Sequence, residues 1–178
     1  QDMGQRRKTK VRIGISPVLS LLMLPQLFVI AREHFGVNLE IHDVDCAESL
    51  RGIEHNDLDL AIALLDDTPY PTVESHILKR TSLQFCTSPG HPLSSQPAIS
   101  QLALQNQPMI LFLPDCLPGN LAEKYSLTSN CMLRTNQLTT LRRYIYSGLA
   151  STLHIPESFG NDPQIISIPL EPPVFLSI

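Results

Sequence analysis

The chain has 178 residues, of which 43% are hydrophobic, and it carries a net charge of −4 at pH 7. That length can bury a substantial core, either as one large domain or as two small lobes. The net negative charge argues against a surface that grips a phosphate backbone on its own. We interpret the basic run at residues 6–8 as part of a solvated linker.

Targeting signals and membrane spans are not expected. The basic start is not followed by the apolar core and small-residue cleavage site of a signal peptide. The densest apolar stretch, residues 18–31, is interrupted by Ser20, Pro25 and Gln26 and falls short of the ~20 residues of a membrane helix. The cysteines show no C-x-x-C spacing, which favours thiols in a reducing, cytoplasmic compartment. They are Cys46, Cys86, Cys116 and Cys131.

Residues 11–41 read as strand, helix and strand, and they match the length of roughly 30 residues that a βαβ unit needs. Ser16 is a good N-cap for the helix, and Pro17 suits its first turn. Apolar residues at three- and four-residue steps predict one helical stripe that Gly36 closes, while Pro25 should kink or restart the helix. The stripe consists of Leu21, Leu24, Phe28, Ala31 and Phe35.

A second strand and helix follow directly. Residues 37–44 are expected to form the strand, and Asp45 and Glu48 have the spacing of a capping box for a helix that runs to about His55. Residues 58–64 form a near-continuous apolar run, which is typical of a strand buried on both faces. This alternation of strands and helices predicts an α/β architecture.

The remaining elements are shorter, and the break at residues 88–92 predicts that the chain passes into a second lobe. Strands are expected at residues 73–78, 83–87, 109–113, 131–133, 150–155, 165–170 and 174–178. Helices are expected at residues 99–104, 119–127 and 137–146, the last entered through Thr135 and Asn136.

Residues 11–27, 39–65 and 88–111 together resemble the effector-binding domain of LysR-type transcriptional regulators. The anchors of the resemblance are Ile13-Gly14 with Leu24-Pro25, the strand at 58–62, His91-Pro92-Leu93, and the helix 138–146 before Gly148. The order and spacing of these anchors carry the resemblance, which extends over residues 11–178.

The resemblance implies two Rossmann-like lobes of the periplasmic type 2 binding protein fold, with a small-molecule effector in the crevice between them. Residues 11–87 and 156–178 would form lobe I, residues 88–155 lobe II, and residues 1–10 a hinge. It also implies a homodimer or tetramer, and DNA binding through an N-terminal winged helix-turn-helix that this chain lacks. The last helix of the family would likewise follow Ile178.

A helix N-terminus offers unpaired N–H groups and partial positive charge, so Ser16 and Pro17 mark a candidate site for a small anion. By resemblance, Val18 and Cys46 match effector-contacting positions that are often more polar in the family, which favours a less polar effector here. Ser88, Pro114 and Asn136 match crevice positions of the second lobe, and Asn136 is expected to cap a helix. The alternatives are structural: Ser16 as an N-cap only, and Cys46 as a buried small hydrophobe.

Cys116 invites a redox interpretation, because it lies near the position of the reactive cysteine in peroxide-sensing members of the same family. The partner cysteine expected nine residues later is absent, since Tyr125 stands there. Two further alternatives are a periplasmic solute-binding protein of the same fold and an enzyme on that fold. Catalysis is not expected, because the sequence has no nucleophile elbow and no phosphate-binding glycine loop.

Neither a metal nor another cofactor is expected. The histidines show no H-x-x-x-H spacing. They are His34, His42, His55, His76, His91 and His154. The resemblance also predicts that the helix 138–146, with Leu138, Leu141 and Ile145 on one face, pairs with a partner subunit together with the helix after Ser16. The alternative is that both helices simply pack on their own sheets.

Overall fold

The computed structural model describes residues 9–66, 70–114, 117–126 and 130–178. The chain folds into two compact units, one of residues 1–63 with 70–74 and the other of residues 64–69 with 75–178. The lobe boundaries implied by the resemblance, with residues 11–87 and 156–178 in one lobe, stay a prediction.

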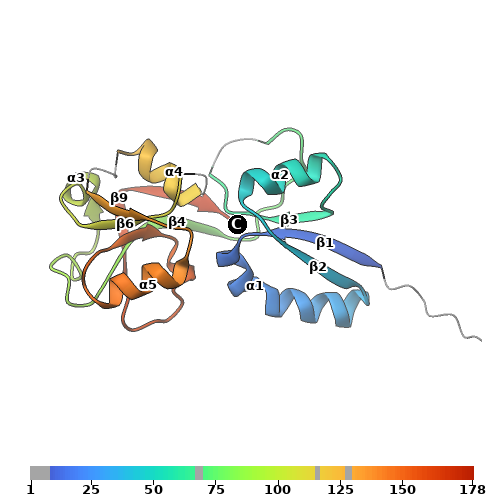
Figure 1. The fold of residues 1–178 in the computed structure, drawn as a ribbon, viewed down its shortest axis with the longest axis horizontal. Helices are drawn as coiled ribbons and strands as arrows, with labels where there is room; N and C mark the ends of the chain where they lie inside the picture. The colour runs from blue at the N-terminus through green and yellow to red at the C-terminus, as the bar shows by residue number, and fades with distance from the viewer. Residues whose placement is uncertain (1–8, 67–69, 115–116, 127–129) are drawn as a thin grey trace, which may run out of the picture. The chain divides into compact units, whose positions relative to one another are not determined.

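Unit 1 is a three-stranded parallel sheet in the order β2-β1-β3. Its elements follow the predicted alternation. They are β1 (Lys10–Ile15), α1 (Pro17–Ile30), β2 (Asn38–Asp43), α2 (Cys46–Glu54) and β3 (Leu60–Ile62). Figure 1 shows α1 on one face of this sheet and α2 on the opposite face, as expected when one crossover leads to a neighbouring strand and the next passes across β1.

The helical region after Ser16 ends at Gly36, as expected, but it does not restart at Pro25. α1 continues through Pro25 to Ile30, and a π-helical segment, η1 (Ala31–Phe35), ends at Gly36 with φ of +62°. Pro25 removes one helical hydrogen bond, to the carbonyl of Leu21, but both residues are exposed, so water can satisfy that carbonyl.

The joined helix Pro17–Phe35 has 19 residues and a mean hydropathy of 1.3, long and apolar enough by these measures to cross a membrane. The expectation that no segment reaches such a length is therefore wrong. One such helix is weak evidence for a membrane span. Here it connects two strands of one sheet and includes Arg32 and Glu33.

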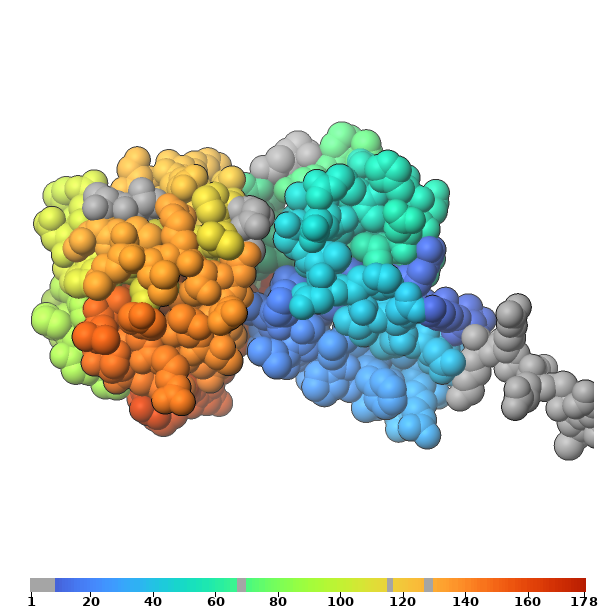
Figure 2. Space-filling model, viewed as in Figure 1, coloured from blue at the N-terminus to red at the C-terminus, as the bar shows by residue number. Residues whose placement is uncertain are grey.

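The apolar stripe on this helix faces solvent over most of its length. Leu21 is 72% exposed, Phe28 56% and Phe35 72%, whereas Ala31 is buried. Val18 and Leu19, in the first turn, make the buried contact instead. The exposed surface of α1 therefore carries large apolar side chains. Figure 2 draws the segment that contains α1 in blue.

The run 58–64 does not form a strand buried on both faces. Only Leu60–Ile62 is a strand, and Leu60 is 55% exposed at the edge of the unit 1 sheet. Leu58 is buried but lies outside β3, where it packs against Gly14 and Gly52. Hydrophobicity alone therefore overstated the length of the strand and its burial.

Unit 2 contains a four-stranded sheet in the order β5-β9-β4-β8 and a parallel pair, β6-β7. Its strands are β4 (Arg80–Thr87), β5 (Ile99–Ser100), β6 (Met109–Leu111), β7 (Cys131–Arg134), β8 (Thr152–His154) and β9 (Ile166–Ser177). Its helices are α3 (Gln101–Leu104), α4 (Leu117–Lys124), α5 (Leu138–Tyr146) and the 3-10 turn η2 (Pro156–Ser158). The buried side chains of Leu83, Phe85, Leu141, Ile145 and Leu153 belong to its core.

The prediction of a strand at residues 73–78 is wrong. These residues form no strand, and Ile77 and Leu78 are 57% and 62% exposed. The strands expected at residues 165–170 and 174–178 are both confirmed as parts of one strand, β9, whose residues 166–169 and 174–177 pair antiparallel with β4. Residues 170–173 of β9 have no partner in β4, so the missing N–H groups of Pro172 and Pro173 fall at the register shift between Leu83 and Gln84.

Candidate functional site

Ser16 occupies the turn between β1 and α1. It is the N-cap of α1 in extended backbone conformation, and its Oγ accepts a hydrogen bond from the N–H of Leu19 at 3.4 Å. Pro17, the first residue of the helix, is exposed and contributes no N–H donor. The capping role predicted from the sequence is confirmed, and the long Oγ bond leaves the hydroxyl loosely held.

Cys46 begins α2 at the corresponding turn after β2. The capping box is complete: the Glu48 N–H donates to Asp45 Oδ1 at 2.7 Å, and the Asp45 N–H donates to Glu48 Oε2 at 3.3 Å. The Cys46 side chain is half-buried.

The structure brings Ser16 and Cys46 to the same edge of one sheet. β1 and β2 are parallel neighbours in which Ile15 pairs with Asp43, and the Val44 N–H donates to the Ile15 carbonyl at 3.3 Å. The two helix starts therefore follow adjacent strand ends. Val18 is only 8% exposed, so it contributes packing under the first turn of α1.

The candidate residues of unit 2 also follow strand ends. Ser88 follows β4 and is half-buried, and its carbonyl accepts a hydrogen bond from the N–H of His91 at 3.0 Å. Pro114 follows β6 and is exposed, and Asn136 follows β7. The Asn136 Oδ1 accepts a hydrogen bond from the Leu113 N–H at 3.2 Å, which joins the ends of β6 and β7.

The expectation that Asn136 caps α5 is wrong. The N-cap is Gln137, whose side chain makes no capping bond. The Gln137 N–H instead donates to Thr135 Oγ1 at 3.1 Å. Asn136 does not cap the helix because its Oδ1 accepts a hydrogen bond from the Leu113 N–H, near the end of the neighbouring strand.

The cysteines differ in their capacity for thiol chemistry. Burial raises the pKa of Cys86 to about 12, and its thiol lies near the His154 carbonyl and Ser167 Oγ, so it does not form a thiolate near neutral pH. Cys116 lies outside the described residues. Within the described ranges, no group of three His, Cys, Asp or Glu side chains is arranged to hold a metal ion.

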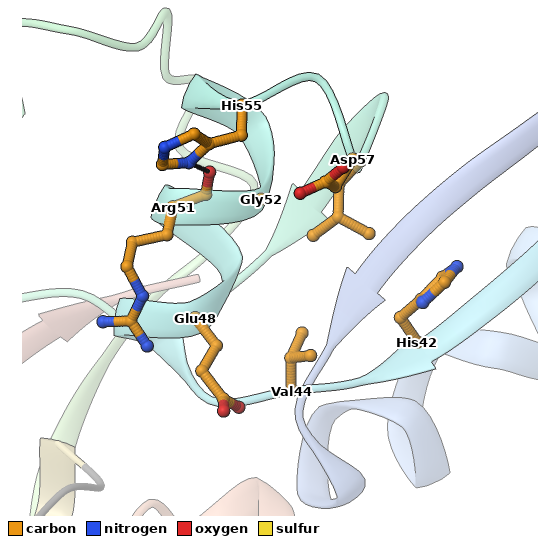
Figure 3. A pocket seen from close by; sticks show the side chains of 8 residues that line it. His42, Val44, Glu48, Arg51, Gly52, His55 and Asp57 are labelled. Carbon is orange, nitrogen blue, oxygen red and sulfur yellow. Dashed lines mark hydrogen bonds between the residues drawn. The ribbon is translucent and has the colours of Figure 1, made fainter.

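Unit 1 also has a surface hollow of about 430 Å³ that sequence reasoning missed (Figure 3). It lies beside α2 and the end of β2, and several of its lining side chains are charged or titratable. The lining residues are His42, Val44, Glu48, Arg51, Gly52, His55, Asp57 and Leu58. Only the i, i+4 spacing of Arg51 and His55 hinted at a shared face in the sequence.

Comparisons with solved structures support the fold. HinK, a LysR family transcriptional regulator from Pseudomonas aeruginosa, matches with a TM-score of 0.72 and 23% identity over 96% of this chain and 62% of its own. A second protein, a putative LysR family transcriptional regulator from the same organism, matches with a TM-score of 0.73 and 24% identity over 98% of this chain and 63% of its own. The chain thus spans less than two thirds of the length of either.

A regulatory domain alone is covered more fully. The reduced OxyR regulatory domain from Pseudomonas aeruginosa matches with a TM-score of 0.78 and 16% identity over 95% of this chain and 84% of that domain. No curated protein sequence matches the chain. The family model of the LysR substrate binding domain matches residues 4–176. The chain therefore belongs to the LysR substrate binding domain family.

Proposed function

We propose that this chain is the effector-sensing and oligomerisation domain of a cytoplasmic LysR-type transcriptional regulator. The observation that carries the proposal is the pair of helix starts at Ser16 and Cys46, which follow adjacent strands at one edge of the unit 1 sheet. Ligands of open α/β sheets bind outside the carboxyl ends of the strands. Helix N-termini at that edge favour an anionic group.

The proposed effector is a small carboxylate with an apolar body. The loosely held Ser16 hydroxyl and the N–H groups of the first turn would meet the carboxylate. Val18 and the Cys46 thiol would offer it little polar contact. Ser88, Pro114 and Asn136 of unit 2 are proposed as further effector contacts on the strength of the family resemblance.

The exposed apolar surface of α1, rather than that of α5, supports a role in oligomerisation. The exposed apolar side chains Leu21, Phe28 and Phe35 have no cover within the described part of the chain. The apolar face of α5 packs inward instead: Leu141 and Ile145 are buried, and Leu138 packs against the Ile145 cluster. We therefore assign the subunit contact to α1 and ordinary core packing to the apolar face of α5.

Regulation would follow from a population shift, in which the effector favours one arrangement of the oligomer and so repositions DNA-binding domains elsewhere in the protein. Catalysis is no part of this proposal, since the family is regulatory. The same membership favours a regulator over a periplasmic solute-binding protein. A thiol redox sensor remains an alternative tested by labelling Cys116.

A thermal-shift screen of small carboxylates tests the proposal. At a concentration 100 times its Kd, a true effector stabilises the folded chain by about 2.7 kcal/mol. Calorimetric titration of a hit should then show weaker binding to Ser16→Ala. Ser20→Ala is the matched control, because its hydroxyl donates to the Pro17 carbonyl at 2.8 Å within the same helix. Equal affinity for the wild type and Ser16→Ala would remove Ser16 from the site.

A further inference from the structure

Two polar side chains of β8 are enclosed in the core of unit 2. Thr152 is 0% exposed and His154 is 1% exposed. Neither Thr152 Oγ1 nor His154 Nε2 has a hydrogen-bond partner within the described ranges. Nearly all buried polar groups of folded proteins are hydrogen-bonded, either to protein or to ordered water. These two atoms therefore call for a partner that the described side chains do not supply.

The two side chains share one face of β8, because they are two residues apart in the strand Thr152–His154. Leu153, which lies between them, points to the opposite face. Residues so spaced lie roughly 6.6 Å apart along a strand. A water molecule about 2.8 Å from each of two atoms can join atoms up to about 5.6 Å apart. One water molecule therefore has the right size to contact both side chains.

The surroundings of the pair are closed and largely apolar. The His154 ring packs between Phe112 and Phe159, at centroid distances of 4.6 and 5.9 Å. Cys86, which pairs with Thr152 across the sheet, is fully buried. Neither of the two polar atoms is hydrogen-bonded to a charged side chain in the part of the chain that the structure describes. A neutral ligand is therefore favoured over an ion, whose charge would have no compensation there.

The other nitrogen of the imidazole determines what Nε2 can do. His154 Nδ1 lies 2.7 Å from Ser158 Oγ. If the Ser158 hydroxyl donates to Nδ1, then Nε2 carries the proton and is a donor; if Nδ1–H donates to Ser158 Oγ, then Nε2 is an acceptor. The Thr152 hydroxyl can both donate and accept. Water also does both, so it matches the pair of atoms in either tautomer.

We infer that one internal water molecule bridges Thr152 Oγ1 and His154 Nε2 in the core of unit 2. The water connects Thr152 to the His154–Ser158 pair and so links the side chains of β8 to the turn η2. It should exchange more slowly than surface water, because both of its partners are sealed from solvent. The site includes none of the proposed effector contacts and does not depend on the proposed function.

Oxygen-17 relaxation dispersion of the 178-residue chain tests this inference, because it counts water molecules that stay bound longer than the protein tumbles. Thr152→Val removes the hydroxyl but keeps the branched shape, and it should lose about one long-lived water per chain. Thr152→Ser keeps the hydroxyl and should keep the water. Thr139→Val is the control, because Thr139 is exposed on α5, and it should keep the wild-type count. Equal counts in the wild type and Thr152→Val would overturn the bridge.

A crystal structure of the wild type that resolves ordered water gives a second test, and it requires no variant. The expected result is an electron-density peak within about 3.2 Å of both Thr152 Oγ1 and His154 Nε2. A direct hydrogen bond between these two atoms, or no peak between them, would overturn the inference. A peak within this distance of only one of them would also contradict the bridge.

Discussion

The Nδ1 of His154 lies 2.7 Å from the Oγ of Ser158, and both residues are buried in unit 2. The imidazole is packed between the rings of Phe112 and Phe159, at centroid distances of 4.6 and 5.9 Å. Its Nε2 has no hydrogen-bond partner among the described residues. Burial therefore lowers the pKa of His154 to about 4, although a hydrogen bond with the Ile155 carbonyl and the charge of Glu157 oppose the shift.

This environment predicts a loss of stability in mild acid. The unfolded chain takes up a proton at an ordinary histidine pKa of about 6.5, whereas folded His154 resists protonation until about pH 4. The free energy of unfolding should therefore fall as the pH drops from about 6.5, by about 3 kcal/mol at pH 4 from this group alone. Urea unfolding of unit 2 across this pH range measures the effect.

The double variant His154→Phe with Ser158→Ala isolates the imidazole, because it removes both hydrogen-bonding partners and fills the aromatic site. Its unfolding free energy should lack this part of the pH dependence. His34→Gln is the control, since His34 is exposed, and it should keep the wild-type slope. An unchanged slope in the double variant would assign the acid sensitivity to other groups.

Thiol labelling should distinguish the cysteines. Cys86 is fully buried with its pKa raised to about 12, so it should resist iodoacetamide in the native state at pH 7.5 and react only after unfolding. Cys131 is half-buried and should react faster than Cys86. Mass spectrometry of timed samples gives each rate. Native labelling of Cys86 as fast as that of Cys131 would contradict the burial argument.

The same samples test the redox alternative through Cys116. A sensor thiol should alkylate faster than free cysteine at neutral pH, because it must be largely ionised. A rate no faster than that of free cysteine would remove this alternative without affecting the proposed effector domain.

The sequence predicted unit 1 well wherever local chemistry decides structure. Ser16, Pro17 and Gly36 mark the ends of one helical region through hydrogen bonding and backbone preference, and Asp45 with Glu48 starts the next. Such signals depend on residues a few positions apart, so they are legible in one chain. The positions of Ser16 and Cys46 at one sheet edge followed from the parallel βαβ order.

The failures at Leu60, at Asn136 and at the hollow beside α2 involve contacts between distant segments. Leu60 is exposed because its strand lies at the edge of the unit 1 sheet, which hydrophobicity does not reveal. Asn136 does not cap α5 because its side-chain amide accepts a hydrogen bond from the N–H of Leu113, 23 residues earlier in the chain. The hollow beside α2 combines residues from β2, α2 and the turn before β3, and their meeting depends on the packing of Leu58 into Gly52.

The capping box should contribute measurably to the stability of unit 1. Asp45→Ala removes the acceptor of the Glu48 N–H at 2.7 Å and should lower the free energy of unfolding by about 1 kcal/mol. Asp43→Ala is the control, because Asp43 is exposed at the end of β2 and does not cap the helix. Chemical denaturation of both variants makes the comparison. An equal loss in the two would show that general charge removal, rather than the cap, is responsible.

Phe28 and Phe35 should carry the subunit contact of α1. They are 56% and 72% exposed on a helix whose first 14 residues, Pro17–Ile30, include no charged side chain, so covering them with a second copy would remove substantial apolar area from water. The wild type should be a dimer at micromolar concentration by light scattering after gel filtration. Phe28→Ser and Phe35→Ser should each weaken the dimer by about 30-fold, the effect expected of aromatic residues at the centre of an interface.

Phe175→Ser is the matched control for these variants, because Phe175 is 62% exposed on β9 of unit 2, away from α1 in the chain. This substitution also replaces a phenylalanine ring with a serine hydroxymethyl group, but it should leave the dimer intact. Since all three phenylalanines are largely exposed, none of the substitutions should lower the melting temperature of the monomer by more than a few degrees. A monomeric wild type, or equal dissociation of the Phe175→Ser and Phe28→Ser proteins, would show that the apolar side of α1 does not bind a second copy.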